Sequence, residues 1–391
     1  MVVAQSEPLA PLTHDRSPAA QATLVPSRFY LPELDLIRLV AFFLVFMSHV
    51  VPGEPEFYQE AGIPGPIAMA IVSVAAGGAF GVDLFFALSS FLITALLLEE
   101  RKTTGHIDVV SFYLRRVLRI WPLYFTFLLI VAPLVRTIIP DDRLPARDAV
   151  AFTLLVGNWA FVVWGYAHSI VGPLWSVSVE EQFYLVWPPL LRRFAGHLPS
   201  ALIGVWLVSI ATRTVLVLMG AVHPQIWCNT VAHLDPIACG GLLAVVFRKY
   251  NIALGAGSRV GLLCCGVGAF ALAGRFGDFA GPRALVTYPV VALASCGFIV
   301  GSLRPRRDLS RCLLVRPALY LGKISYGLYV FHLMFITLLG VGAAHTPARR
   351  VFLICGAFLC SVVAAASSYH VLERPFLALK KRVTHVPSRP V

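Results

Sequence analysis

Apolar runs long enough to cross a lipid bilayer recur along this chain from Leu34 to Leu372. A helix that spans the roughly 30 Å hydrocarbon core needs about 20 mainly apolar residues. Inside lipid the backbone must satisfy its own hydrogen bonds, so a series of such runs predicts α-helices. Only 13% of the residues are charged and 58% are hydrophobic, which is unlike a soluble globular domain. The sequence therefore predicts an all-α integral membrane protein.

About ten spanning helices are predicted, at 36–51, 76–98, 119–138, 177–191, 199–219, 230–247, 258–274, 283–302, 324–343 and 349–371. With a cytoplasmic N-terminus, this count places 23 Lys and Arg residues on the cytoplasmic side and 7 on the outer side. That bias follows the positive-inside rule and predicts an inner-membrane protein with both termini in the cytoplasm. The apolar stretch 149–165 is therefore predicted not to cross, and an eleventh span there is the alternative.

The two ends of the chain differ from its body. Residues 1–30 are polar, contain four prolines and lack the basic and apolar regions of a signal peptide, which predicts a disordered tail. Residues 33–376 form the predicted transmembrane domain, and 377–391 a basic cytoplasmic tail. The net charge of +12 is explained by topology and anionic lipid, so no nucleic-acid partner is expected. The cysteines have no metal-binding spacing, and no metal site is predicted.

Two polar residues, Arg38 and His49, interrupt the first apolar run. Eleven residues at about 100° each place them within about 20° of one helix face, roughly 16 Å apart along the axis. A charged arginine in hydrocarbon costs about 2.5–3.5 kcal/mol, so it needs a partner or a wet cavity. Singly, Arg38 is explained by snorkelling to the interface and His49 by a place in the core. Together they predict a polar pore or cavity within the membrane.

A basic cluster stands at the predicted cytoplasmic start of the third span. Arg116 and Arg119 lie three residues apart on one helix face, with Arg115 beside them. One interpretation is an anchor that obeys the positive-inside rule. The other is a phosphate clamp, because the guanidinium fork matches phosphate oxygens.

Carboxylates and hydroxyls lie at membrane depth in later spans. Asp83 falls in an apolar helix and is a candidate partner of Arg38 or Arg213. Glu180 follows a predicted helix start at Ser176, and acidic residues are common in the first turn of a helix. That preference does not explain why a carboxylate is placed at membrane depth. A third group, with one predicted face in common, consists of Ser325, Tyr329 and His332. Hydrogen bonding between helices is the simpler explanation of that face, and catalysis is the alternative.

In this order the motifs resemble membrane acyltransferase family 3, the bacterial O-acyltransferases that modify surface sugars and some macrolides. The resemblance runs from about residue 33 to 376. It rests on Arg38 with His49, on 81–86, on Arg116 and Arg119 with Ile120, Pro122 and Tyr124, on Trp175, Ser176, Glu180, Phe183 and Tyr184, on Ser325, Tyr326, Tyr329 and His332, and on 373–376. The chain departs from the family pattern at Leu36, Ser90 and His233, where glycine, glycine and arginine are usual.

The resemblance implies an O-acyltransferase that moves an acyl group, most often acetyl from acetyl-CoA, to a hydroxyl of a sugar, glycolipid or macrolide. It is consistent with His49 as general base, with Glu180 or Asp83 orienting the imidazole or stabilising its cation, and a covalent acyl-histidine route is the alternative to direct transfer. The donor site implied comprises Arg38, Arg116, Arg119 and Tyr124. Further polar site residues are Trp175, Ser176, Arg213, Asp235, Ser325, Tyr329 and His332.

No permanently bound cofactor is expected. A transporter or flippase for an anionic or lipid-linked substrate is the alternative, because intramembrane charges also serve transport. The absence of an internal repeat weakens that alternative. A structural or sensor membrane protein, in which His49 would be dispensable, is a third possibility.

Overall fold

The computed structural model describes residues 31–139, 141–250, 252, 254–277, 279–303, 315–344 and 346–380. Within these ranges every regular element is helical, as the sequence predicted. The predicted N-terminal tail lies outside the described residues. The predicted C-terminal tail overlaps them only at 377–380, which belong to the helix α17 (Arg374–Lys380).

Long helices make up most of the fold. The helix α3 (Gly65–Gly77) continues through η1 (Gly78–Phe80) into α4 (Gly81–Thr104). The helix α5 (Val109–Thr126) continues through the π-helical turn η2 (Phe127–Val131) into α6 (Ala132–Arg136). The others are α1 (Pro32–Val50), α9 (Leu174–Phe194), α10 (Leu198–Leu218), α11 (Asp235–Lys249), α12 (Ala256–Phe276), α13 (Ala284–Ser302), α14 (Arg316–Lys323), α15 (Ser325–Leu338) and α16 (Pro347–Ser368), which reaches α17 through η6 (Tyr369–Glu373).

Six helical stretches of the described chain are long and apolar enough to cross a membrane: 65–104, 109–136, 198–218, 256–276, 284–302 and 347–379. A seventh arises if α14 and α15, which meet at a bend of 76°, count as one broken span. The remaining predicted spans fall on α1, α9 and α11. α1 carries Glu33, Asp35 and Arg38, α9 carries two glutamates and two arginines, and α11 has only 15 residues. Charge and length therefore separate these three helices from the others.

The stretch 149–165 does not form one continuous helix. It is divided between α7 (Ala146–Thr153) and α8 (Gly157–Trp164), which are separated at Leu155, where φ is 60°. Eight residues of α-helix are about 12 Å long, far less than the hydrocarbon core. Neither helix can cross a bilayer by itself.

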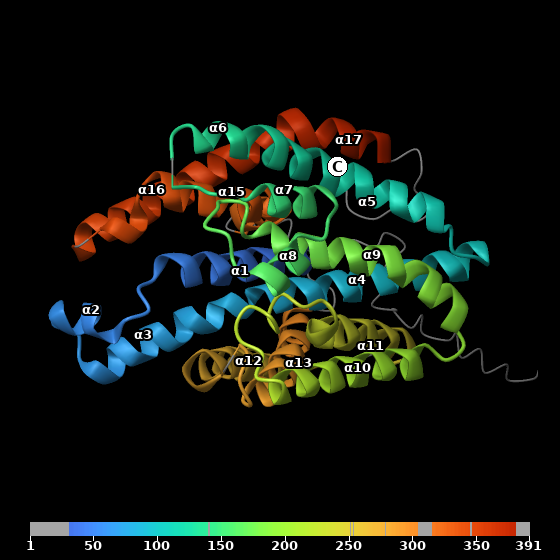
Figure 1. The fold of residues 1–391 in the computed structure, drawn as a ribbon. Coiled ribbons are helices and arrows are strands. Elements are labelled where there is room, and N and C mark those ends of the chain that lie inside the picture. Colours follow the sequence, from blue (N-terminus) through green and yellow to red (C-terminus); the bar gives the residue numbers. More distant parts are fainter. Residues whose placement is uncertain are drawn as a thin grey trace, which may run out of the picture.

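The helix α1 lies in the middle of the bundle and packs against α4, α14 and α15. Figure 1 shows the long helices side by side, with α5, α6, α16 and α17 along one flank and α10 to α13 along the other. The helix α4 joins the two halves, since it also packs against α11 and α13. Proline suits the start of α1 because its fixed φ fits a helix and its missing N–H leaves no donor unpaired there, and the acids in the first turn suit the helix macrodipole.

Glycines bring the central helices into backbone contact. A Cβ atom at Gly78 would collide with the carbonyl oxygen of Leu44, and one at Gly81 with that of Ala41. A Cβ atom at Gly240 would likewise meet the backbone of Ala87. Small residues at such crossings are typical of membrane helix pairs. They fix the height of α1 relative to α4, and of α4 relative to α11.

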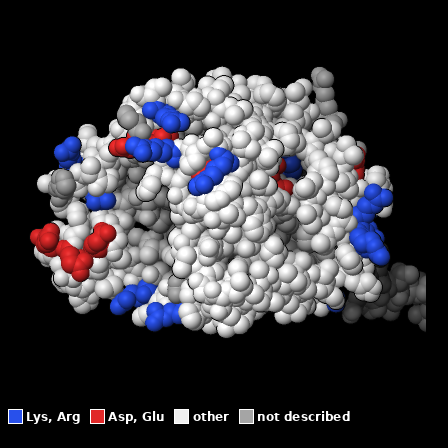
Figure 2. Space-filling view, viewed as in Figure 1, with Lys and Arg blue, Asp and Glu red and all other residues white. Residues whose placement is uncertain are grey.

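Charged side chains are sparse on much of the outer surface. Figure 2 shows a face that is largely uncharged, with an acidic group at the end where α2 (Pro55–Glu60) lies. The acidic group comprises Glu54, Glu56 and Glu60, whose side chains are exposed. Many large apolar side chains are also exposed on α10, α13 and α16. An apolar exterior of this kind suits contact with lipid.

Candidate functional site

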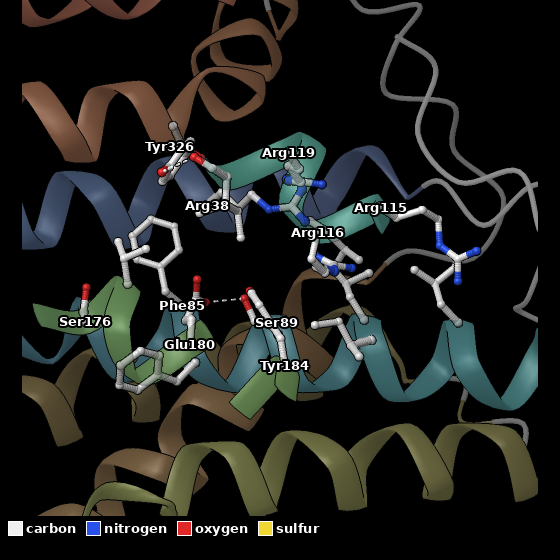
Figure 3. Close-up of a pocket in the computed structure, with 18 of the residues that line it drawn as sticks. Arg38, Phe85, Ser89, Arg115, Arg116, Arg119, Ser176, Glu180, Tyr184 and Tyr326 are labelled. Carbon is white, nitrogen blue, oxygen red and sulfur yellow. Dashed lines mark hydrogen bonds between the residues drawn. The ribbon is translucent and has the colours of Figure 1, made fainter. Parts of the chain in front are cut away.

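One elongated pocket of about 160 Å³ lies between α1, α4, α5, α9 and α15. Its polar lining residues are Arg38, Ser89, Glu100, Arg115, Arg116, Arg119, Ser176, Glu180, Tyr184, Ser325, Tyr326 and Tyr329. Figure 3 shows that Arg115 and Ser176 lie at opposite ends of the labelled set, with Arg38, Arg116, Arg119 and Glu180 between them. Apolar residues of α4, among them Phe85, Phe86 and Leu97, line the wall between these groups.

The basic end of the pocket holds four arginines from two helices. Arg38, on α1, is bound by Asp35 one turn earlier, at 2.6 Å. Arg115 donates to Glu100 at 2.9 Å, which ties the start of α5 to the end of α4. The guanidinium of Arg116 lies over the rings of Phe112 and Tyr184, 5.4 and 5.1 Å from their centroids. With Arg119, these side chains give the pocket an excess of positive charge over Glu100 and Glu180.

Glu180 lies in this pocket and not beside His49. Ser89 donates a hydrogen bond to its Oε1 atom at 2.6 Å, and its side chain is partly exposed. The carboxylate therefore faces the same space as Arg116 and Arg119. The sequence motif on α9 thus joins the basic cluster on α5 in one site.

Hydroxyl groups close the other end of the pocket. The Tyr329 hydroxyl lies 2.8 Å from Ser176 Oγ and donates to the Pro173 carbonyl at 3.1 Å. The ring of Phe85 packs edge-on against Tyr329, at 5.9 Å between centroids. Ser325 lies here as well, and both serines are buried. Tyr329 therefore lies at the end of the pocket, in contact on its other side with the ring of His332.

His49 lies outside the pocket, beyond Tyr329. The centroid of its ring lies 5.1 Å from that of His332, and the two ring planes form an angle of 75°. The His332 ring in turn lies 5.5 Å from the Tyr329 ring, between centroids. The Nδ1 atom of His49 is 2.7 Å from the Val45 carbonyl oxygen, which can only accept. The neutral ring therefore carries its hydrogen on Nδ1 and its lone pair on Nε2. Its side chain is exposed at the end of α1.

The partner of the His49 ring differs from the one that the sequence predicted. Neither Glu180 nor Asp83 contacts the ring: Glu180 bonds to Ser89, and Asp83 bonds to His233 at 2.9 Å. The backbone carbonyl of Val45, one turn back on the same helix, orients the imidazole instead. The reason is topological, since α4 and α9 direct both carboxylates toward other elements.

Asp83 belongs to a buried pair. His233 approaches it with Nε2, while Nδ1 of the same ring donates to the Trp227 carbonyl at 2.8 Å. Both side chains are fully buried. The predicted pairing of Asp83 with Arg38 or Arg213 is not present. The departure from the family pattern at His233 is thus matched by a carboxylate that holds the imidazole.

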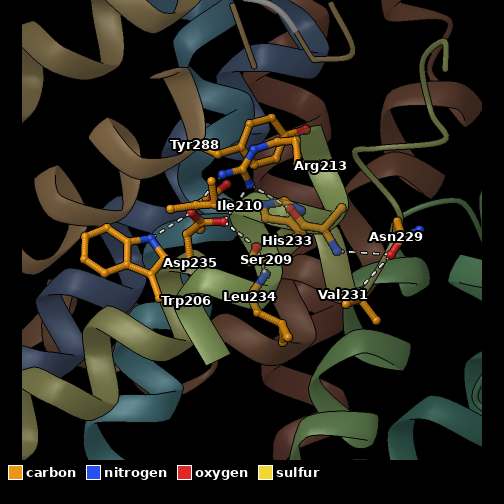
Figure 4. A network of polar contacts seen from close by, with 12 residues as sticks. Trp206, Ser209, Ile210, Arg213, Asn229, Val231, His233, Leu234, Asp235 and Tyr288 are labelled. Carbon is orange, nitrogen blue, oxygen red and sulfur yellow. Dashed lines mark hydrogen bonds and ion pairs between the residues drawn. The ribbon is translucent and has the colours of Figure 1, made fainter. Parts of the chain in front are cut away.

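A second buried pair, Arg213 with Asp235, joins α10 to α11. The guanidinium donates to both carboxylate oxygens, at 2.7 and 3.0 Å. Trp206 and Ser209 donate to the same carboxylate, at 2.9 and 2.7 Å. Figure 4 shows these groups converging on Asp235, with Tyr288 against the guanidinium. The network lies outside the pocket, and its geometry is that of a helix clamp.

Two further predicted site residues also lie outside the pocket. Tyr124, predicted to bind the donor, is buried and donates to the Phe152 carbonyl at 2.8 Å. The ring of Trp175 stacks at 6.2 Å on His233. Both side chains support the pocket from behind rather than lining it.

Seven of the predicted residues therefore line one pocket: Arg38, Arg116, Arg119, Ser176, Glu180, Ser325 and Tyr329. Three further lining residues, Ser89, Glu100 and Tyr184, were not predicted from the sequence as site residues. Glu100 is the second of two glutamates that follow three leucines at the end of an apolar run, a pattern that is typical of an ordinary helix end. The described residues contain no group of three or more His, Cys, Asp or Glu arranged to hold a metal ion.

An acyltransferase-domain family model matches residues 31–366, nearly the whole described chain. The chain belongs to this acyltransferase family. It is 26% identical over 342 residues to "O-acetyltransferase OatA" of Staphylococcus aureus (strain NCTC 8325 / PS 47), covering 80% of this chain and 56% of that protein. It is 27% identical over 336 residues to "Peptidoglycan O-acetyltransferase OatA" of Listeria monocytogenes, covering 80% and 50%.

The chain thus spans about half the length of the curated relatives that it matches. No solved structure matches the chain.

The different surroundings of Asp83 and Glu180 predict different results when each carboxylate is replaced. We expect Asp83→Asn to lower the folded yield, because the amide cannot replace the ionic partner of a fully buried imidazole. We expect Glu180→Gln to keep the yield and lower activity, because Glu180 is partly exposed in the pocket. Yield and monodispersity in detergent, measured beside activity, separate the two. Equal loss of yield in both variants would make Glu180 structural.

Proposed function

We propose that this protein is an integral-membrane O-acyltransferase that moves an acyl group, typically acetyl, from acyl-CoA to a hydroxyl group. One observation carries the proposal. A single pocket has four arginines toward one end and hydroxyl groups at the other. From that second end, the ring of Tyr329 contacts the ring of His332, which in turn contacts the ring of His49. Membership of the acyltransferase family supports the reaction class.

The pocket suits the donor by charge and shape. The nucleotide part of CoA carries several phosphate charges, for which arginine forks are good ligands. The pantetheine arm is narrow, and the apolar wall of α4 would accompany it from Arg116 toward Ser176. The arm would continue past Tyr329, so that the thioester meets the acceptor hydroxyl beside His49. In this arrangement Glu180 and Ser89 offer polar contacts along the arm.

His49 is the base in the mechanism that we propose. Its Nε2 lone pair would take the proton of the acceptor hydroxyl while the oxygen attacks the thioester carbonyl. The new oxygen–carbon bond forms, the carbon–sulfur bond breaks, and the proton passes from His49 to the departing thiolate. The Val45 carbonyl keeps the ring in the required tautomer throughout, a role that a carboxylate plays in many triads.

The acceptor in this proposal is a carbohydrate of the cell envelope, a glycolipid or a macrolide. The named relatives support a cell-wall sugar, since one of them is a peptidoglycan O-acetyltransferase. His49 is exposed at the end of α1, so an acceptor would reach it without passing through the pocket. Donor and acceptor would then approach the histidine from opposite sides of the membrane.

Turnover of labelled acetyl-CoA by the purified protein tests the proposal. We expect release of CoA that depends on an added glycan acceptor, with label recovered in the acceptor. Movement of a substrate across vesicles without CoA release would favour the transporter alternative instead. Mass spectrometry of surface glycans from cells with and without the gene would identify the acceptor by a mass difference of one acyl unit.

We further propose ten spans in the inner membrane, with α1, α9 and α11 crossing as inner helices of the bundle and both termini cytoplasmic. Shielding by neighbours would let these helices carry the charges that lipid-facing helices lack. Reporter fusions after Arg193, Lys249 and Arg382 are expected to read as cytoplasmic. Fusions near Glu60, Pro224 and Thr346 are expected to read as external. An external signal after Arg193 would contradict this topology.

Donor binding should depend on the basic end of the pocket. We expect Arg119→Ala to weaken acyl-CoA binding by about 10- to 100-fold, the usual effect of losing a charge-assisted hydrogen bond. Lysine at this position should restore only part of the affinity, because the planar fork is lost. Affinity in detergent at two ionic strengths is the measurement, and the wild type should be the more salt-sensitive.

Arg192→Ala is the matched control, since Arg192 is exposed on α9 and lies outside the pocket. Unchanged affinity in Arg119→Ala together with reduced affinity in His49→Ala would place the donor on the other face.

A further inference from the structure

A second histidine, His332, lies directly beside His49. The two rings meet at 5.1 Å and 75°. Unlike His49, His332 is completely buried, among the rings of Phe42 at 6.0 Å and Tyr329 at 5.5 Å. It therefore occupies the space between His49 and the closed end of the pocket. Interhelical packing alone would be served by an apolar residue at this position.

Both histidines hold the same tautomer. The Nδ1 atom of His332 is 2.6 Å from the Tyr329 carbonyl oxygen, as that of His49 is 2.7 Å from Val45. A carbonyl only accepts, so in each neutral ring the hydrogen is on Nδ1 and the lone pair is on Nε2. Two imidazoles thus stand together, each held by its own helix with its acceptor nitrogen available.

The Nε2 atom of His332 has no hydrogen-bond partner within the part of the chain that the structure describes, although it is buried. A buried polar atom left in this state is destabilising, and such atoms call for an explanation. The carboxylates of Asp83 and Glu180 do not supply one, because each is bonded to another residue and an ionised carboxylate has no hydrogen to donate. What Nε2 needs is a hydrogen-bond donor, and His49 becomes one when it is protonated.

We propose that His332 is a positioning residue of the catalytic centre, whose Nε2 accepts a hydrogen bond from Nε2–H of the His49 imidazolium. This inference rests on the proposed function, since it requires His49 to take a proton. The His49 imidazolium then has both N–H groups paired, Nδ1–H with the Val45 carbonyl and Nε2–H with His332. Among the described residues no carboxylate is hydrogen-bonded to the His49 ring, so these two hydrogen bonds would stabilise the cation in its place.

The proton balance is simple. The acceptor O–H bond breaks, its proton moves to His49 Nε2, and the oxygen–acyl bond forms as the carbon–sulfur bond breaks. The imidazolium turns its Nε2–H from the new ester toward His332, and then delivers the proton to the thiolate. His332 neither gains nor loses a proton, and its lone pair only stabilises the cation between the two transfers.

Two nearly isosteric variants test the role of the nitrogen. The side-chain oxygen in His332→Gln can accept a hydrogen bond near the position of Nε2, whereas His332→Met fills similar space without a comparable acceptor. We expect His332→Met to lower kcat by about 10- to 100-fold with the KM for donor unchanged, and His332→Gln to retain most of the activity. His197→Met, at an exposed loop position, is the control.

The double variant of His332→Met with His49→Ala completes the test. Because His332 acts through His49, its replacement should not lower the residual rate of His49→Ala further. Equal losses in the Gln and Met variants, in rate or in folded yield, would overturn the inference and leave a packing role. Failure of the proposed function is recognised separately, by a wild type that does not transfer acyl groups from CoA or a His49→Ala variant of normal activity.

Discussion

Replacing His49 by alanine should lower acyl transfer by about 10²- to 10⁴-fold, the usual contribution of a general base. The variant should still insert and fold, because the His49 side chain is exposed and its hydrogen bond is made within its own helix. The loss should appear in kcat, while acyl-CoA affinity stays close to that of the wild type. Single-turnover transfer and donor binding, measured on the same preparation, separate the two quantities.

His197→Ala provides the control for His49→Ala, since that histidine is exposed on the loop between α9 and α10. Near-normal transfer by His49→Ala at a normal protein level would remove the base from this mechanism. The pocket would then have to act with another group, and Glu180 would be the next to test.

Breaking the buried pair of Arg213 and Asp235 should cost about 3–5 kcal/mol of stability, the usual penalty for a buried charge left without its partner. Within the described chain, Arg213→Met leaves the Asp235 carboxylate with two neutral donors, Trp206 and Ser209. We expect a large fall in folded yield and in the temperature of unfolding in detergent. Arg283→Met, which removes an exposed arginine, is the matched control.

A double variant distinguishes the charge from the contact. When Arg213→Met and Asp235→Leu are combined, no unpaired charge remains, and part of the stability should return. The prediction fails if Arg213→Met unfolds at the temperature of the wild type. Activity is not expected to be lost beyond the loss of folded protein, because neither residue lines the pocket.

The sequence predicted helices and charge groups well where the information is local. Each predicted span falls on a helix, and the spacing of Arg38 and His49 along α1 follows from helix geometry alone. The distribution of Lys and Arg between the loops argued against a membrane span at 149–165, and the structure divides this segment into two short helices. Hydropathy and charge bias are properties of single segments, so they survive without knowledge of neighbours.

Pairings between segments could not be predicted in this way. Asp83 and His233 are 150 residues apart, and Ser89 and Glu180 are 91 apart. Which helices become neighbours depends on packing that no single span encodes. Glu180 was therefore expected beside His49, whereas α9 places it among the arginines. The Val45 carbonyl was missed for a different reason, since every residue has a carbonyl and none is marked in a sequence.

The backbone contacts at Gly78, Gly81 and Gly240 bear on how loss-of-function screens of this protein should be interpreted. Any side chain at these positions would force α1, α4 and α11 apart, although none of the three glycines takes part in the chemistry. A screen scored by activity will therefore group them with His49. Only a parallel measurement of protein abundance will distinguish substitutions that remove the proposed base from those that prevent assembly of the helices around it.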